Sequence, residues 1–111
     1  MPGPRMTLPT QAVLRELLAD PTRAMYGLEI CAAAGLPSGT IHPILARLER
    51  FGWLESYWEE VDPHEKGRPR RRYYQLNPKN VAAAQAALHR ADANTRAIKK
   101  LRPGLAGGEA R

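Results

Sequence analysis

Cationic and small polar side chains are concentrated in two segments in the middle of the chain, residues 38–50 and 66–73. In the first segment, apolar residues recur at i, i+3, i+4 and i+7, which predicts an amphipathic helix with one polar face. Arginine can pair bidentately with guanine or clamp a phosphate, and free N–H groups at a helix start can also bind phosphate. We therefore predict nucleic-acid contact by Ser38, Gly39, Thr40, His42, Pro43, Arg47 and Arg50. The competing interpretation is a solvated polar face, which any surface helix has.

The second segment holds five cations within seven residues: Lys66, Arg68, Arg70, Arg71 and Arg72. The Arg68-Pro69 step favours an extended backbone that could enter a minor groove, where arginine is favoured. We predict that these cations and the following Tyr73 contact DNA; the alternative is a charge cluster that only keeps a hairpin soluble. Five nearby carboxylates are expected to pair with the arginines or to face away from phosphates: Glu55, Glu59, Glu60, Asp62 and Glu65.

The composition agrees with a nucleic-acid partner. At 111 residues and 43% hydrophobic, the chain can form one small domain with a modest core. Its 17 Lys and Arg exceed its 11 Asp and Glu, and the net charge of +6 favours a polyanionic partner, nucleic acid before membrane surface. No stretch approaches the ~18 apolar residues of a membrane span, and the start lacks the apolar run of a signal peptide. We expect a protein of the reducing cytoplasm.

Other chemistry finds little support. His42, His64 and His89 are too scattered for a metal site. Cys31 has no partner cysteine, so neither a disulfide nor a cysteine-based zinc site is expected. The chain has no glycine-rich phosphate loop ahead of a helix and no nucleophile motif, so we predict no enzymatic activity, no metal and no cofactor.

The surrounding sequence predicts three helices and a hairpin. The helices span 11–19 with Thr10 as N-cap, 26–34 ending at Gly35, and 38–51 with Ser38 as N-cap and Gly52 at the exit. Strands are predicted at 54–60 and 71–76, with a loop between them and with Tyr74 and Leu76 pointing inward. A helix with a polar outer face fits a major groove, and a two-stranded wing with a cationic tip can hold phosphate.

A fourth helix is predicted from Pro78 to about Arg102, with Asn77 as its N-cap. Small and apolar residues at 3-4 spacing form a heptad seam along it: Val81, Ala84, Leu88, Ala91, Thr95 and Ile98. Because such small residues would make a weak two-helix coil, we predict that the helix also packs on the partner subunit's first helix, through Val13 and Leu17. The alternative is a monomer whose terminal helix folds back on its own domain.

Helix, helix, recognition helix, wing and long terminal helix is the winged helix-turn-helix plan, and residues 11–80 resemble the PadR family of bacterial transcription regulators. The matching stretches are Tyr26-Gly27-x-Glu29-Ile30, Ser38-Gly39-Thr40-Ile41-His42-Pro43-Ile44-Leu45-x-Arg47-Leu48-Glu49, Gly52-Trp53-Leu54, Trp58-Glu59 and Gly67-Arg68-Pro69-Arg70-Arg71-Arg72-Tyr73-Tyr74-x-Leu76. The joint pattern is specific, because Gly-Thr-x-x-Pro-x-Leu stands ahead of Arg-x-Tyr-Tyr-x-Leu.

The resemblance implies a dimeric repressor, often one that controls its own operon or a detoxification or efflux gene. His42 stands where the family usually has tyrosine, and the second helix with its turn is compressed. No helical region is expected beyond the fourth helix, so a small-molecule effector is possible but not indicated. The implied organisation is a flexible arm (1–9), a winged helix-turn-helix domain (10–76), a dimerisation helix (77–102) and a flexible tail (103–111).

The predicted function is a homodimeric, sequence-specific DNA-binding regulator, a repressor with recognition helices one turn (~34 Å) apart on a palindromic operator. Two alternatives remain open. One is a winged helix that docks an acidic protein partner through its basic wing. The other is a protein that coats nucleic acid without sequence preference.

Overall fold

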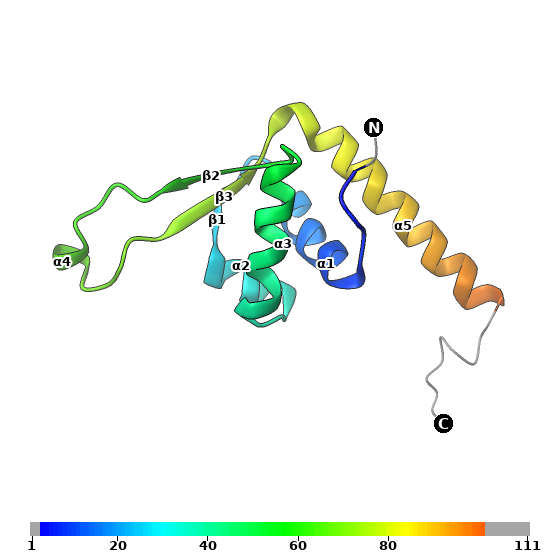
Figure 1. The fold of residues 1–111 in the computed structure, drawn as a ribbon, viewed down its shortest axis with the longest axis horizontal. Coiled ribbons are helices and arrows are strands. Elements are labelled where there is room, and N and C mark those ends of the chain that lie inside the picture. Colours follow the sequence, from blue (N-terminus) through cyan, green and yellow to red (C-terminus); the bar gives the residue numbers. More distant parts are fainter. Residues whose placement is uncertain (1–2, 102–111) are drawn as a thin grey trace, which may run out of the picture.

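The chain folds mainly into helices around a small antiparallel sheet, as seen in a computed structural model that describes residues 3–101 (Figure 1). The elements are α1 (Leu8–Ala19), β1 (Met25–Tyr26), α2 (Gly27–Ala34), α3 (Ser38–Arg50), β2 (Leu54–Trp58), α4 (Pro63–Lys66), β3 (Arg72–Leu76), the 3-10 turn η1 (Pro78–Asn80) and α5 (Val81–Leu101). The predicted class, mainly α with a β-hairpin in a winged helix-turn-helix, is confirmed. The predicted tail at 103–111 and the predicted helix end at Arg102 lie outside the described residues.

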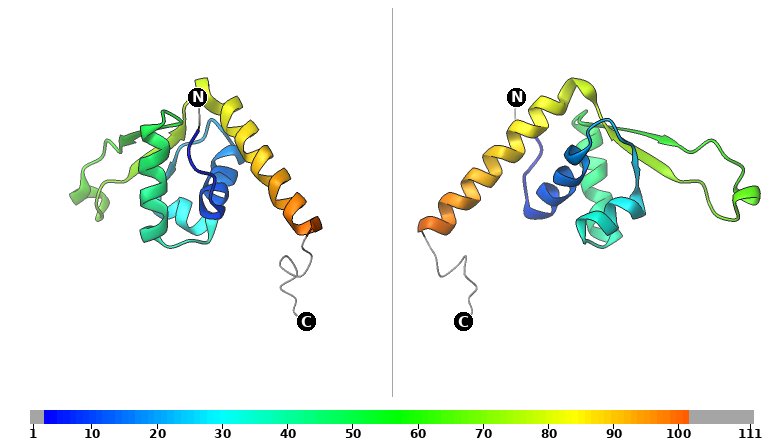
Figure 2. Two further views of the ribbon diagram at one scale, coloured as in Figure 1. Left: turned by 45° about the vertical axis from the view of Figure 1, so that its right-hand side comes forward. Right: turned by 180° about the vertical axis from the view of Figure 1, so that it is seen from behind.

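Three parts of the molecule point in different directions (Figures 1 and 2). α1, α2 and α3 pack together at the centre. The hairpin of β2 and β3, here called the wing (residues 54–76), extends to one side and carries the short α4 at its tip. α5 extends on the other side and packs along α1. α3 contacts β2 and therefore lies next to the base of the wing.

The sheet has three strands in the order β1-β3-β2, one more than predicted. Residues 25–26 form the extra strand, in which Met25 pairs with Tyr74. The sequence had placed Tyr26 at the start of a helix, because two residues are too few to show an alternating pattern. β2 ends at Trp58, two residues earlier than predicted, and the predicted loop contains α4. Tyr74 and Leu76 are buried, as predicted for the inward face.

Two predicted N-caps are wrong. α1 begins at Leu8, inside the predicted arm, and its N-cap is Thr7, whose Oγ accepts from the Thr10 backbone N–H at 3.3 Å. Thr10 is fully buried, and its own hydroxyl lies 2.9 Å from that of Thr7. A proline is tolerated in a first helical turn, so Pro9 does not stop α1. α3 includes Ser38 as its first residue, and Pro37 takes the cap position.

The core forms where α1, α3 and the sheet meet. Four apolar residues of α3 are 0–5% exposed, as their spacing predicted: Ile41, Ile44, Leu45 and Leu48. Gly35 and Gly52 adopt φ of 71° and 80° after α2 and α3, the left-handed exits predicted for them. These exits turn the chain sharply from α2 toward α3 and from α3 into the wing.

α5 packs on the chain's own α1, and this corrects part of the predicted dimer interface. Val13, Leu17 and Ala84 are 0–1% exposed within their own chain, so they hold its core and offer no surface to a partner. Arg15 of α1 also pairs with Asp92 of α5 at 3.0 Å, an exposed ion pair between the two packed helices. An apolar stripe serves a subunit's own core and a dimer interface equally well, so its spacing could not separate the two uses.

Candidate nucleic-acid interface

α3 presents the predicted polar face to solvent. Five of its residues are exposed, namely Ser38, Gly39, His42, Pro43 and Arg50, while Thr40 and Arg47 are half-buried. The opposite face is buried in the core, so the direction of this face is fixed by packing. No carboxylate lies among these seven residues, which leaves the face suitable for an anionic ligand.

His42 rests against the start of α2. A Cβ on Gly27 would lie 3.1 Å from His42 Cε1, tighter than an ordinary contact. The missing side chain at position 27 therefore makes room for the imidazole ring. His42 nevertheless stays exposed to solvent.

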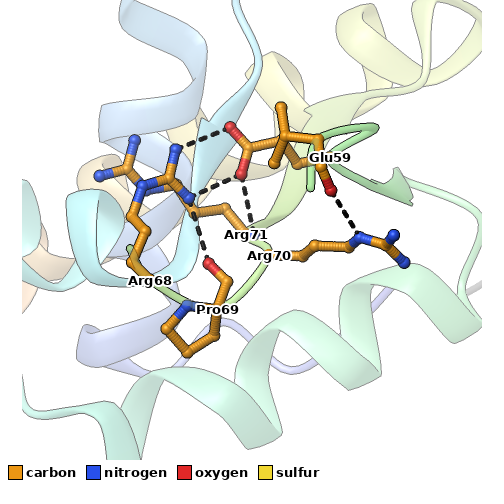
Figure 3. A network of polar contacts seen from close by, with 6 residues as sticks. Glu59, Arg68, Pro69, Arg70 and Arg71 are labelled. Carbon is orange, nitrogen blue, oxygen red and sulfur yellow. Dashed lines mark hydrogen bonds and ion pairs between the residues drawn. The ribbon is translucent and has the colours of Figure 1, made fainter. Parts of the chain in front are cut away.

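Arg68 is held by Glu59 across the wing (Figure 3). Its Nη1 and Nη2 donate to the two Glu59 carboxylate oxygens at 2.7 and 3.0 Å, a bidentate pair. Glu59 Oε1 also accepts from the backbone N–H of Arg71 at 3.2 Å. Pairing between the nearby carboxylates and the wing arginines, expected from the sequence, is therefore confirmed for Glu59. Arg68 therefore connects the segment that follows β2 to the segment that precedes β3, and it is not a free cation.

The other wing cations have different surroundings. The Arg71 guanidinium carbon lies 4.1 Å from the centroid of the Tyr26 ring, which makes a cation–π contact with β1. Arg70 donates from Nε to the Val61 carbonyl at 2.9 Å and keeps an exposed side chain. Lys66 and Arg70 form no ion pair with any residue in the 3–101 range. These two are the wing cations that are most available to phosphate.

The wing tyrosines pack against one another. Tyr73 stacks on Tyr57 with ring centroids 5.8 Å apart and meets Tyr26 edge to face at 5.7 Å. Tyr73 is half-buried in this cluster, so its predicted DNA contact is restricted to the exposed part of its ring. Burial raises the pKa of Tyr74 on the opposite face of β3, and the nearby Arg72 charge partly offsets that effect.

A comparison with models of protein families identifies the family of this chain. The model of the "Transcriptional regulator PadR-like family" matches residues 16–85, which include α2, α3 and the whole wing. The chain belongs to the PadR-like family. This confirms the resemblance carried by the motifs of α3 and β3. A search among curated proteins found no matching relative.

Solved structures share the fold of this PadR-like chain. A PadR family transcriptional regulator from Eggerthella lenta DSM 2243 has a TM-score of 0.61 at 21% identity, covering 85% of this chain and 84% of that one. A PadR-like transcription factor from Bacteroides fragilis has a TM-score of 0.57 at 23% identity, covering 86% and 87%. BpsR of Bordetella bronchiseptica, whose DNA binding is regulated by 6-hydroxynicotinic acid, has a TM-score of 0.66 at 17% identity, covering 89% and 69%.

A groove of about 710 Å³ lies between α5 and the segment that precedes α1. Gly3, Pro4 and Met6 line it on the N-terminal side, and Trp53 and Asn80 also belong to the lining. The α5 side is lined by the apolar Ile98 and by small and polar residues, which are Ala83, Ala86, Ala87, Arg90, Ala91, Asn94 and Thr95. Sequence reasoning missed the N-terminal wall, because a segment rich in proline and glycine gives no periodic signal.

Among the described helices of this PadR-like chain, none is long and apolar enough to cross a membrane.

The Glu59–Arg68 pair gives a pH prediction. The Arg68 hydrogen bonds, helped by the Arg71 backbone N–H, lower the pKa of Glu59 from 4.5 to about 2. A carboxyl whose pKa is lowered by folding stabilises the folded state above its unfolded pKa, and this contribution is lost as pH falls toward the folded pKa. We expect Glu59→Gln to be less stable than the unchanged protein at pH 6, and the difference to shrink between pH 4.5 and pH 2.

Urea unfolding at pH 6, 4 and 3 measures this difference, with Glu55→Gln as the matched control. Glu55 is exposed on β2, four residues before Glu59, and forms no ion pair among the described residues. A Glu59→Gln deficit that stayed constant from pH 6 to pH 3 would show that the carboxylate's charge is not what stabilises the wing.

Proposed function

We propose that this PadR-like protein is a homodimeric transcriptional repressor that binds a palindromic operator through α3 and the wing. The observation that carries the proposal is the solvent face of α3, which combines Arg47 and Arg50 with small residues and is set rigidly by the buried face behind it. Small residues allow the helix to enter a major groove closely, and arginine pairs bidentately with guanine. Membership of a transcription-regulator family supports DNA as the ligand.

The wing supplies sequence-independent affinity in this proposal. Lys66 and Arg70 reach phosphates beside the groove that α3 enters, while Arg68 keeps the hairpin in shape. A second subunit places another α3 one turn away, and the pair occupies promoter DNA that polymerase would need. Repression by occlusion follows from that geometry.

Selection from a random duplex library, followed by fluorescence anisotropy at ~150 mM salt, tests the proposed function. We expect the selected duplex to bind ~10³-fold more tightly than a scrambled one of the same length and composition. Equal affinity for both would replace the proposal with a coating protein. No binding to either would point to a protein-interaction module and exclude DNA as the ligand.

α5 is proposed to provide the dimer contact through its exposed apolar residues, since its buried ones belong to the core. Ile98 is 56% and Leu101 is 81% exposed, and Leu8 of α1 is 69% exposed. Val81, Leu88, Ala91 and Thr95 are half-buried, and Ala91 and Thr95 line the same groove as Ile98. Covering these apolar side chains removes them from water, which favours association.

We expect Ile98→Asp to raise the dimer dissociation constant at least about tenfold, because a carboxylate would be buried without a partner. Sedimentation velocity over a dilution series measures this constant. Ala93→Asp is the matched control, since Ala93 is exposed on α5 and does not line the groove. Equal dissociation constants for the two variants would place the dimer contact elsewhere.

A further inference from the structure

Three side chains connect the last turn of α3 to both strands of the wing. The Ser56 hydroxyl of β2 donates to Glu49 Oε2 of α3 at 2.6 Å. Arg72 of β3 donates to the same hydroxyl oxygen from Nε and Nη2, at 3.1 and 2.7 Å. Arg72 Nη2 also lies 3.6 Å from Glu49 Oε2, within ion-pair distance. We call Glu49, Ser56 and Arg72 the α3–wing bridge.

The bridge uses the full bonding capacity of the Ser56 hydroxyl, which has one donor and two acceptor sites. The donor is directed to the carboxylate, and the two acceptor sites receive the guanidinium N–H groups. Arg72 is held further by the ring of Trp58, 5.5 Å from its guanidinium carbon, and by that of Tyr74 at 6.0 Å. The geometry therefore holds the guanidinium against the sheet, and the predicted contact of Arg72 with DNA is restricted to the exposed part of its side chain.

The bridge lies outside the hydrophobic core. The side chains of Arg72 and Glu49 are 40% and 36% exposed, and neither belongs to the buried cluster. Glu49 stands between Arg47 and Arg50, the two arginines of the α3 solvent face. Ser56 and Arg72 lie in the paired part of the wing, with Ser56 opposite Tyr74 and Arg72 opposite Trp58. The bridge thus joins the helix that would read bases to the hairpin that would hold phosphates.

We propose that Glu49, Ser56 and Arg72 are positioning residues that set the direction of the wing relative to α3, so that both reach DNA in a single docking geometry. This inference rests on the proposed DNA-binding function. A two-stranded hairpin is not stable on its own, so its direction depends on what its base contacts. Fixing that direction before binding removes the entropy cost of ordering the wing on the DNA.

Ser56→Ala removes the central oxygen of the bridge with little change in size, and Ser56→Thr keeps the hydroxyl. We expect Ser56→Ala to weaken binding to the library-selected duplex about tenfold and binding to a scrambled duplex by less, so that the preference for the selected duplex falls. Ser56→Thr should restore the preference. Arg70→Ala should cost less affinity in the Ser56→Ala background than alone, because a misdirected wing no longer brings Arg70 to its phosphate.

A double-mutant cycle separates positioning from general destabilisation, since a stability loss would leave the effect of Arg70→Ala unchanged. If the unchanged protein prefers its selected duplex and Ser56→Ala keeps that preference, or if the two substitutions are additive, the inference is overturned. If the unchanged protein shows no preference, the proposed function fails instead.

A measurement without DNA then still decides on the bridge. Spin labels are attached to cysteines that replace Ala46 of α3 and Lys66 at the wing tip, and Cys31→Ala removes the native thiol. The two labels report the distance between α3 and the wing. We expect Ser56→Ala to broaden the distance distribution and Ser56→Thr to keep it narrow. An unchanged distribution in Ser56→Ala would show that the bridge does not set the direction of the wing.

Discussion

Replacing Leu48 by alanine is expected to lower the free energy of unfolding by about 2–5 kcal/mol, the range for leucine-to-alanine changes in a packed core. Leu48 is fully buried on the inner face of α3, in the cluster that joins α1, α3 and the sheet. The removed atoms lose their transfer free energy, and the cavity left behind adds to the cost. A domain of this size has a free energy of unfolding of roughly 5–15 kcal/mol in total, so the variant should lose a large fraction of its stability.

Leu28→Ala is the matched control, because Leu28 is 70% exposed on α2. It should change the unfolding free energy by no more than about 0.5 kcal/mol. Urea unfolding followed by circular dichroism, at one fixed protein concentration because a dimer would couple association to unfolding, compares the two. Similar losses in both variants would contradict the position of Leu48 in the core.

The inner face of α3 could be predicted because helical periodicity and burial report the same physical constraint. The spacing of four apolar residues places them on one side of a helix, namely Ile41, Ile44, Leu45 and Leu48. All four are buried, because an apolar stripe of this width is covered by the core. The outer face followed from the inner one by geometry. The motifs of α3 and β3 then predicted the family without knowledge of the tertiary structure.

Which wing arginines are paired and which are exposed could not be predicted, because this depends on partners across the wing. Arg68, Arg70 and Arg72 alternate in the sequence and look alike there. In the structure, Arg68 is paired with Glu59, Arg72 is held by Ser56, and Arg70 retains an exposed side chain. A partner nine or sixteen residues away is set by strand register, which local sequence does not determine. The basic cluster is thus partly structural.

The use of the apolar stripe on α1 could not be settled from sequence for a related reason. Val13 and Leu17 are fully buried against the chain's own elements. Ala84 and Ala87 of α5 approach closely because alanine is small, and this close contact buries α1 without a partner subunit. What the dimer proposal retains is the outer half of α5, where Ile98 is exposed. The sequence pattern did not indicate which half of α5 would pack on α1 and which half would stay exposed.

Arg47→Ala is expected to weaken binding to the library-selected duplex about 10- to 100-fold, corresponding to roughly 1–3 kcal/mol for one bidentate pair with a base. Arg47 is half-buried on the solvent face of α3, near the exposed Arg50. Binding to a scrambled duplex should change little. Arg70→Ala at the exposed wing tip should instead weaken all duplexes and reduce the salt slope by about one.

Fluorescence anisotropy on both duplexes, at several salt concentrations, distinguishes the two arginines. Arg96→Ala is the charge-matched control, because Arg96 is exposed on α5 and lies outside the α3 face and the wing. Its small effect on both duplexes would isolate the loss of net charge from the loss of a contact. If Arg47→Ala weakened every sequence equally, Arg47 would be a phosphate contact, and base readout would have to come from His42, Arg50 or the start of α3.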